Sequence, residues 1–211
     1  TYRWKRILCG YLLELQEAIF GYMESMERGS GSEALLQEAV EFMERYLHRA
    51  VPEGFSDMDI AARRDIIFQS LNRPLRVCGM VQNVSEPGGG PFWVRMKDGS
   101  LYPQIVEKAQ IDMEDERQRR MLEQSTHFNP VDLVCSLRDY RGNNFKLTDF
   151  RDMDAGIITV KSKGGQHLKA LELPGLWNGS MAYWNTVFVE VPISTFNPVK
   201  TVNDLLRPQH Q

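Results

Sequence analysis

The sequence predicts a mixed α/β protein, in which a helical segment precedes a sheet with flanking helices. Up to residue 74, apolar residues recur every three or four positions, which is the period of an amphipathic helix. After residue 74, short runs rich in Val, Ile, Phe and Trp alternate with turns that contain Gly, Pro and Asn, as is typical of strands. We therefore expect a helical module over 1–74 and a mixed α/β part over 75–211.

Three helices are expected in the first part, over 4–26, 32–51 and 57–73. Ser32 can cap the second helix, and the Ser56–Asp59 stretch offers a start for the third. Pro52 and Pro74 follow the second and third helices, since proline cannot continue a helix. Apolar stripes of this kind usually form core, so we assign this part to packing and not to a site.

The second part is expected to open with a buried strand over 75–81, because most of its residues are apolar. Further strands are expected over 92–96, 104–107, 157–160, 168–173 and 186–191, with one more entered through the 126–135 loop. We also expect a short charged helix over 114–124, with Met121 and Leu122 facing inward, and a last helix through Leu206.

Composition narrows the class of protein. The chain has 211 residues and a net charge of -3, and it lacks the basic face expected of a nucleic-acid partner. Its apolar runs are too short to span a bilayer and no leader is present, so we expect a cytoplasmic protein without a membrane partner. Because it opens at Thr1 directly in a helix, we expect the carboxy-terminal part of something longer.

Cysteine and histidine patterns do not predict a metal site. Cys9, Cys78 and Cys135 form no C-x-x-C pair, and their apolar contexts predict buried, reduced thiols. None of the four histidines has metal-ligand spacing with another, and His127 has no identifiable partner.

The stretch from Ser85 to Asp112 is the strongest local signal for a site. Gly88, Gly89 and Gly90 lack a Cβ, so the backbone can approach a ligand or adopt positive φ there. A strand, a turn at Asp98-Gly99 and a second strand ending at Glu107 follow. A glycine loop that leads into a hairpin ending on an acid predicts one wall of a small-molecule pocket.

Several polar side chains stand in loops beside strands, near Trp177 and Trp184. They include Glu86, Asn129, Asn178, Asn185 and Asn197. An Asn amide both donates and accepts hydrogen bonds, which suits sugar hydroxyls. The alternative is that each Asn only caps a turn.

The carboxy-terminal segment combines a lysine with a helix start. Lys200 precedes the expected 201–206 helix, whose first backbone N–H groups and positive dipole end favour phosphate. An ordinary helix cap with a solvated lysine explains the same pattern equally well.

Five segments resemble the carboxy-terminal half of a bacterial family known as a domain of unknown function: Cys78–Val81, Glu86–Trp93, Thr126–Cys135, Leu171–Gly179 and Phe196–Pro208. This resemblance covers nearly the whole chain and names a family without an activity.

The chain also resembles, more distantly, the UDP-N-acetylhexosamine pyrophosphorylases of the GT-A-like nucleotidyltransferase superfamily. That family has a Glu-Pro-x-Gly loop, a Val-Val-Glu-Tyr strand with Ile soon after, a Phe-Asn loop, and a Glu-Val-Pro strand leading to Phe-Ser-Pro-Leu-Lys-Asn. The matching segments here are Glu86–Gly89, Gln104–Glu107 with Ile111, Phe128–Asn129, and Val189–Pro192 leading to Phe196–Lys200. The resemblance implies the carboxy-terminal part of a GT-A-like fold.

The resemblance also implies roles for individual residues. The family's strand glutamate holds sugar hydroxyls, its loop asparagine contacts the sugar, and its late lysine contacts phosphate. These roles fall on Glu107, Asn129 and Lys200, with the Gly88–Gly90 backbone close to the sugar. The sequence departs from the family at Lys108, where the family has Tyr, and in the continuation of the Phe-Asn loop, so the identity of the sugar stays open.

The implied reaction joins a sugar 1-phosphate to a nucleoside triphosphate and releases pyrophosphate. The family's glycine-rich nucleotide loop and metal-binding Asp have no counterpart here. We therefore expect catalysis, and a divalent metal such as Mg²⁺, only in a longer protein, and no metal held by this chain alone.

Three hypotheses remain open at this point. The chain is the sugar half of a nucleotidyltransferase, which binds a sugar phosphate or nucleotide sugar; or it is a glycosyltransferase-like or non-catalytic nucleotide-sugar binder; or it is an interaction module whose Trp177-Asn178 loop docks a partner protein. The sequence leaves the oligomeric state open.

Overall fold

The computed structural model describes residues 2–29, 32–83, 88–97, 99–199, 201–206 and 210. Three helices come first, as expected: α1 (Tyr2–Glu27), α2 (Glu33–Tyr46) and α3 (Ile60–Leu71). The Ser32 hydroxyl oxygen accepts a hydrogen bond from the Leu35 N–H at 3.2 Å, and the Asp59 carboxylate accepts one from the Ala62 N–H at 2.8 Å. Both capping predictions are therefore confirmed.

A three-stranded mixed sheet forms the centre of the second part. Strand β1 (Leu75–Met80) lies between β4 (Asp132–Ser136), to which it is antiparallel, and β7 (Asn185–Glu190), to which it is parallel. All six residues of β1 are buried. The prediction of a buried strand in a mixed sheet is confirmed.

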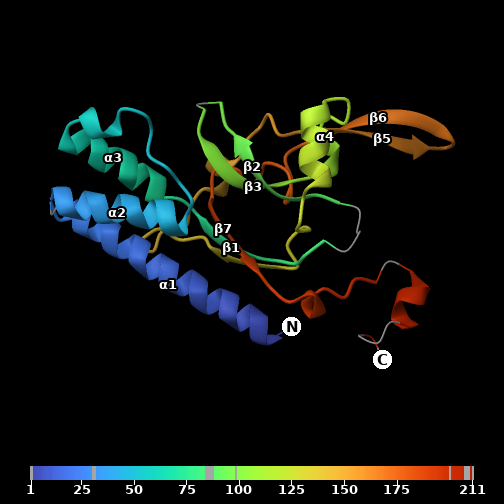
Figure 1. Cartoon of the computed structure of the whole chain (residues 1–211), viewed down its shortest axis with the longest axis horizontal. Helices are drawn as coiled ribbons and strands as arrows, with labels where there is room; N and C mark the ends of the chain where they lie inside the picture. The colour runs from blue at the N-terminus through green and yellow to red at the C-terminus, as the bar shows by residue number, and fades with distance from the viewer. Residues whose placement is uncertain are drawn as a thin grey trace.

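The two faces of this sheet are covered differently. Side chains of α1, α2 and α3 share one hydrophobic cluster with Leu75, Val77 and Val187, and Figure 1 shows the three helices side by side along one side of the sheet. Cys78 and Met80 point to the other face, where they pack with Ile105. At Gly79 an added Cβ would lie 2.9 Å from Leu8 Cδ1, so glycine allows the close approach of α1. The hydrophobic core is continuous across residue 74, where the sequence suggests a boundary between two parts.

Two antiparallel hairpins and one further helix complete the regular structure. The hairpins are β2 (Gly90–Arg95) with β3 (Leu101–Val106), and β5 (Ile157–Lys163) with β6 (Gln166–Glu172); the helix is α4 (Glu116–Glu123). Short 3-10 turns are found at Phe55–Asp57, Lys108–Gln110, Leu147–Phe150, Ile193–Thr195 and Val202–Leu206. Figure 1 shows the β5–β6 hairpin extending away from the sheet.

Several local expectations need correction. Met121 on α4 is 56% exposed and is not part of the buried core. The expected last helix is only the 3-10 turn Val202–Leu206. Of the three cysteines only Cys78 is buried, and burial raises its pKa to about 12, whereas Cys9 and Cys135 are exposed. Among the described helices, none is long and apolar enough to cross a membrane.

Candidate functional site

The glycine loop packs against the chain itself. A Cβ added at Gly89 would lie 2.1 Å from the Val106 carbonyl oxygen, and one added at Gly88 would lie 2.5 Å from the Phe128 ring. A Cβ at Gly90 would lie 2.7 Å from the His127 carbonyl oxygen. None of these three glycines is among the residues with positive φ. Their small size is therefore required by the close contact of the loop with the end of β3 and with the 127–128 segment.

This contact brings together segments that are far apart in the sequence. The Phe128 and Phe196 rings lie 5.3 Å apart between centroids. The Asn129 side-chain amide donates a long hydrogen bond of 3.5 Å to Glu107 Oε1. The glycine loop, Glu107, Asn129 and the Phe196 segment thus form one cluster, which we call the motif cluster. Two candidate residues, Glu86 and Lys200, lie outside the described residues.

Asn129 has an unusual environment within the motif cluster. Its side-chain oxygen Oδ1 is buried and has no hydrogen-bond partner in the part of the chain that the structure describes. A buried acceptor without a partner typically costs about 1–3 kcal/mol. The position therefore calls for a donor that does not come from the described chain.

The other candidate asparagines serve the fold. Asn185 is fully buried, and its amide contacts Arg49 Nη1 at 3.3 Å and the Ser70 carbonyl oxygen at 3.2 Å. Asn178 is 8% exposed and bonds the Gly175 N–H and the Ala155 carbonyl. Asn197 donates to the Ser194 carbonyl at 3.0 Å. Since Asn178 and Asn185 have both ends of their amides occupied by the protein, they offer little to a ligand.

His127 has a partner that the sequence did not reveal. Its Nε2 lies 3.1 Å from Glu190 Oε2, and its Nδ1 lies 2.8 Å from the Thr126 hydroxyl. Gln82 donates to the other oxygen of Glu190 at 3.3 Å. The sequence does not identify this partner because Glu190 is 63 residues away. Glu190 stands next to Val191-Pro192, in a segment that resembles the pyrophosphorylases. This position was the signal in the sequence that could have identified Glu190 as a site residue.

The carboxy-terminal segment is less suited to phosphate than its sequence suggests. The Asp204 carboxylate accepts hydrogen bonds from the Thr201 N–H at 2.7 Å and from the Thr201 hydroxyl at 3.2 Å. An acidic group therefore already occupies the start of this short 3-10 turn. Any contact of Lys200 with phosphate rests on the sequence resemblance alone.

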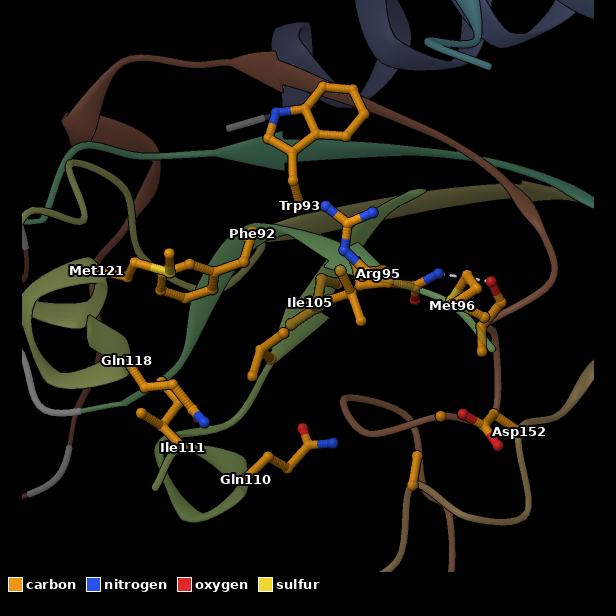
Figure 2. A pocket seen from close by; sticks show the side chains of 16 residues that line it. Phe92, Trp93, Arg95, Met96, Ile105, Gln110, Ile111, Gln118, Met121 and Asp152 are labelled. Atoms are coloured by element: carbon orange, nitrogen blue, oxygen red, sulfur yellow. Dashed lines mark hydrogen bonds between the residues drawn. The ribbon is translucent and has the colours of Figure 1, made fainter. Parts of the chain in front are cut away.

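A cavity of about 470 Å³ lies beside the motif cluster, between the β2–β3 hairpin, α4 and the loops around residues 152–155 and 179–182. Residues 92–96, 104–106, 110 and 111 provide more than half of its lining (Figure 2). The hairpin of the Ser85–Asp112 stretch thus lines a cavity, while the predicted pocket wall of glycine loop and acid stays a prediction. Gly88–Gly90, Glu107 and Asn129 are not among the lining residues.

The lining of the cavity is mainly apolar, with a few polar groups. Phe92, Val94 and Met96 are half-buried, whereas the alternate residues Trp93 and Arg95 are exposed. Successive side chains of a strand point to opposite faces, so the first set shares one face of β2; Trp93 and Arg95, on the other face, also line the cavity. The polar lining residues are Arg95, Gln104, Gln110, Gln118 and Asp152. Within the described residues, no group of three or more His, Cys, Asp or Glu side chains lies together as a metal site would require.

Comparison with solved structures finds two point mutants of UDP-glucose pyrophosphorylase from Leishmania major, each in complex with UDP-glucose. Both share 18% identity with this chain, with TM-scores of 0.38 and 0.40. The alignments cover 71% and 80% of this chain but only 33% and 38% of those proteins, so the chain spans about a third of their length.

Curated protein sequences give no significant match. The family model described as "Domain of unknown function (DUF4301)" matches residues 1–211, and the chain therefore belongs to this family.

Proposed function

We propose that this chain forms the sugar-binding half of a nucleotidyltransferase that joins a sugar 1-phosphate to a nucleoside triphosphate. The observation that carries the proposal is the contact of Glu107 with Asn129, next to the buried, unpartnered Asn129 oxygen. These are the two residues to which the pyrophosphorylase resemblance gives sugar contacts. Glu107 and Asn129 lie in one cluster with the glycine loop, which supports the same assignment.

The chemistry of the motif cluster suits a sugar hydroxyl. A hydroxyl group carries one donor and two acceptor lone pairs. It can donate to Asn129 Oδ1 or to the Glu107 carboxylate, and hydrogen bonds to a charged group contribute about 1.5–3 kcal/mol. Glu107 acts here as a hydroxyl acceptor, with no role as a general base.

In the proposed reaction a phosphate oxygen of the sugar 1-phosphate attacks the α-phosphorus of the nucleoside triphosphate. A new P–O bond forms, and the bond from the α-phosphorus to the bridging oxygen breaks, so that pyrophosphate leaves. Lys200 is assigned to the phosphate by the sequence resemblance, where a lysine serves as a point charge. Most of the catalytic effect in such a reaction comes from positioning and electrostatics.

A divalent metal is expected to support this reaction in the longer protein. The described residues offer no grouping of three acidic, cysteine or histidine side chains that fits such an ion.

Substitution of Asn129 by leucine tests the proposal. Leucine has a similar size and removes the unpartnered oxygen. The hydrogen bond to Glu107 that it also removes is long, at 3.5 Å, so we expect unchanged or higher free energy of unfolding. If the oxygen contacts the sugar, the affinity for UDP-glucose measured by calorimetry falls roughly tenfold, because one ligand hydrogen bond contributes about 1 kcal/mol or more. Stability is thus retained or raised while the affinity for the ligand falls.

Asn144→Leu is the matched control, because Asn144 is exposed and outside the motif cluster. It should leave the affinity for UDP-glucose unchanged. Lys200→Ala should also weaken UDP-glucose binding. The proposal is wrong if the unmodified protein binds neither UDP-glucose nor a UDP-N-acetylhexosamine nor the corresponding sugar 1-phosphates. It is also wrong if Asn129→Leu and Lys200→Ala both bind the preferred nucleotide sugar as the unmodified protein does.

The docking-loop alternative receives less support from the contacts. Trp177 packs against the cluster of Cys78, Met80 and Ile105, and the Asn178 amide is occupied by loop backbone. A non-catalytic nucleotide-sugar binder uses the same motif cluster, and turnover by the longer protein distinguishes it from an enzyme.

A further inference from the structure

Arg76 in the central sheet is a buried charge that the proposed sugar site does not use. It lies on β1, where Cys135 of β4 and Thr186 of β7 are its partners in register. The residue is 1% exposed, and burial lowers the pKa of its guanidinium, yet an arginine stays protonated in proteins. A charge in this position requires compensation from groups close to it.

The described residues supply little of this compensation. Arg76 Nε donates to the Thr186 hydroxyl at 2.8 Å, and its Nη1 donates to the Met181 sulfur at 3.2 Å. A thioether is a weak acceptor, and a guanidinium has five N–H donors, so much of its capacity is unused. In the part of the chain that the structure describes, the titratable groups that act on Arg76 are the thiols of Cys78 and Cys135. Burial raises the pKa of both thiols, that of Cys78 to about 12, so neither supplies a negative charge at neutral pH.

Trp184 is a second buried donor without an acceptor. The residue is 6% exposed, and its indole Nε1 has no hydrogen-bond partner among the described residues. Its backbone N–H donates to the Met181 carbonyl at 3.2 Å, and its carbonyl accepts from the Thr186 hydroxyl at 3.5 Å. Since Met181 and Thr186 are also the two residues that Arg76 contacts, these four residues form one group, which we call the donor cluster.

The charge of the donor cluster selects the kind of acceptor that suits it. The cluster contains one cation and no acid, so one negative charge neutralises it. A phosphate group carries about −1.5 to −2 charges at pH 7 and would leave excess negative charge buried. A neutral acceptor such as water leaves the guanidinium charge uncompensated. A small monovalent anion, either a halide or a carboxylate, supplies both the acceptor and the charge.

We propose that a small monovalent anion binds at the donor cluster, where it accepts hydrogen bonds from the Arg76 guanidinium and the Trp184 indole N–H. It takes the place of the Met181 sulfur beside Arg76 Nη1, because a methionine side chain is flexible and can rotate away. Gly179 and Ala182, close to Met181 in the sequence, line the cavity beside the β2–β3 hairpin, which gives the anion a route to the cluster. The bound anion links the loop that carries Met181 to the sheet. This inference does not rest on the proposed function, because the motif cluster contributes no residue to it.

Arg76→Met tests the inference with chloride as the probe, on the whole chain. Broadening of the chloride NMR signal reports exchange of the ion with a protein-bound state, and the unmodified protein should produce it. Methionine removes the charge and keeps a long side chain, so we expect the affinity for chloride to fall at least about tenfold, the effect of losing a charged hydrogen bond. Stability toward urea in chloride-free buffer should be retained or raised, since an uncompensated buried charge is removed. A loss of chloride binding is then not a loss of folding.

Two further variants change the other members of the donor cluster. Trp184→Phe keeps an aromatic ring and removes the indole donor, so chloride should bind several-fold more weakly. Met181→Ala removes the competing sulfur, so chloride should bind more tightly, which a purely structural role of Met181 does not predict. Arg117→Met is the matched control, because Arg117 is exposed on α4 and outside the donor cluster. It should bind chloride as the unmodified protein does.

Competition identifies the anion and separates this inference from the proposed function. Acetate that reverses the chloride broadening supports a site shared by carboxylates and halides, and acetate without effect supports a site for halides. Asn129→Leu should bind chloride normally. The inference is overturned if the unmodified protein broadens the chloride signal no more than Arg76→Met does, or if Trp184→Phe and Met181→Ala both leave chloride binding unchanged. Tighter binding of inorganic phosphate than of chloride at Arg76 would also overturn it.

Discussion

The glycines at residues 88–90 were the clearest signal for a site in the sequence. The physical reason for glycine at these positions differs from the one expected. The glycine run predicts either close approach of a ligand or positive φ. At Gly89 the neighbour is the Val106 carbonyl of the same chain, and a backbone atom cannot move aside as a flexible side chain can. This contact holds Glu107 next to the loop, so the glycines act on the candidate site by fixing its geometry.

Gly89→Ala should therefore be strongly destabilising. Its Cβ would lie 2.1 Å from the Val106 oxygen, and relief of this clash must separate the loop from β3. Overpacking of this kind typically costs about 1–3 kcal/mol, and backbone displacement places this case at the upper end. The measurement is the free energy of unfolding from urea denaturation.

Gly10→Ala is the matched control for this prediction. Gly10 lies in the middle of α1, and nothing is found within 4 Å of its added Cβ. Alanine is favoured over glycine inside a helix by about 0.5–1 kcal/mol, so this variant should be more stable than the unmodified protein. Equal effects of Ala at the two positions would refute the steric explanation for Gly89.

Among the elements, the β5–β6 hairpin stands out because it extends from the sheet and exposes apolar residues. Ile158, Val160 and Leu171 are each about two thirds exposed. Ile158 pairs with Leu171 and Val160 with Lys169, so these side chains share one face of the hairpin. An isolated two-stranded hairpin is only marginally stable in water. The turn between β5 and β6 must then contribute much of the stability that keeps the two strands in register.

The conformation of this turn predicts how substitutions in it affect the β5–β6 hairpin. Gly164 and Gly165 have φ of 59° and 79°, as a two-residue type I′ turn requires. Gly164→Asn should preserve the hairpin because Asn-Gly is favoured in this turn, whereas Gly165→Val should disrupt it. Amide hydrogen exchange of residues 157–172 should be much faster in Gly165→Val and unchanged in Gly164→Asn. Retained protection in Gly165→Val would show that the turn does not determine the hairpin.

The elements were predicted well wherever a local period was clear. The stripe Leu8, Leu12 and Leu15 and the apolar run of β1 both identify their elements without reference to the rest of the chain. Met121 was misassigned because α4 is short and packs beside a cavity, so its apolar side is not fully covered. Glu107 and Asn129 were linked in advance only by the sugar-binding roles that the family resemblance implies, and their contact was not predicted. Gln110 and Gln118 were missed as cavity-lining residues because nothing in the sequence near them signals a shared cavity.

At the scale of the whole molecule, the helices and the sheet share one hydrophobic core. Leu8 and Leu15 of α1 belong to the same buried cluster as Leu75, Val77 and Val187. The side chain of Lys5, also on α1, forms an ion pair with the largely buried carboxylate of Asp132 at the start of β4. The sequence suggests a boundary at residue 74, and these contacts argue that the two sides fold together.

A truncated chain of residues 75–211 tests this coupling. Without the helices, one face of the β1–β7 pair would expose Leu75, Val77 and Val187 to water, and burial of each such side chain contributes about 1.5–3 kcal/mol. This loss is comparable to the total stability of a typical domain, about 5–15 kcal/mol. We expect the truncated chain to aggregate or to lack the dispersed amide NMR spectrum of a folded protein, and the unmodified chain to unfold in one calorimetric transition. Folding of 75–211 on its own, or two separate transitions in the unmodified chain, would instead establish the boundary at residue 74 as one between independent domains.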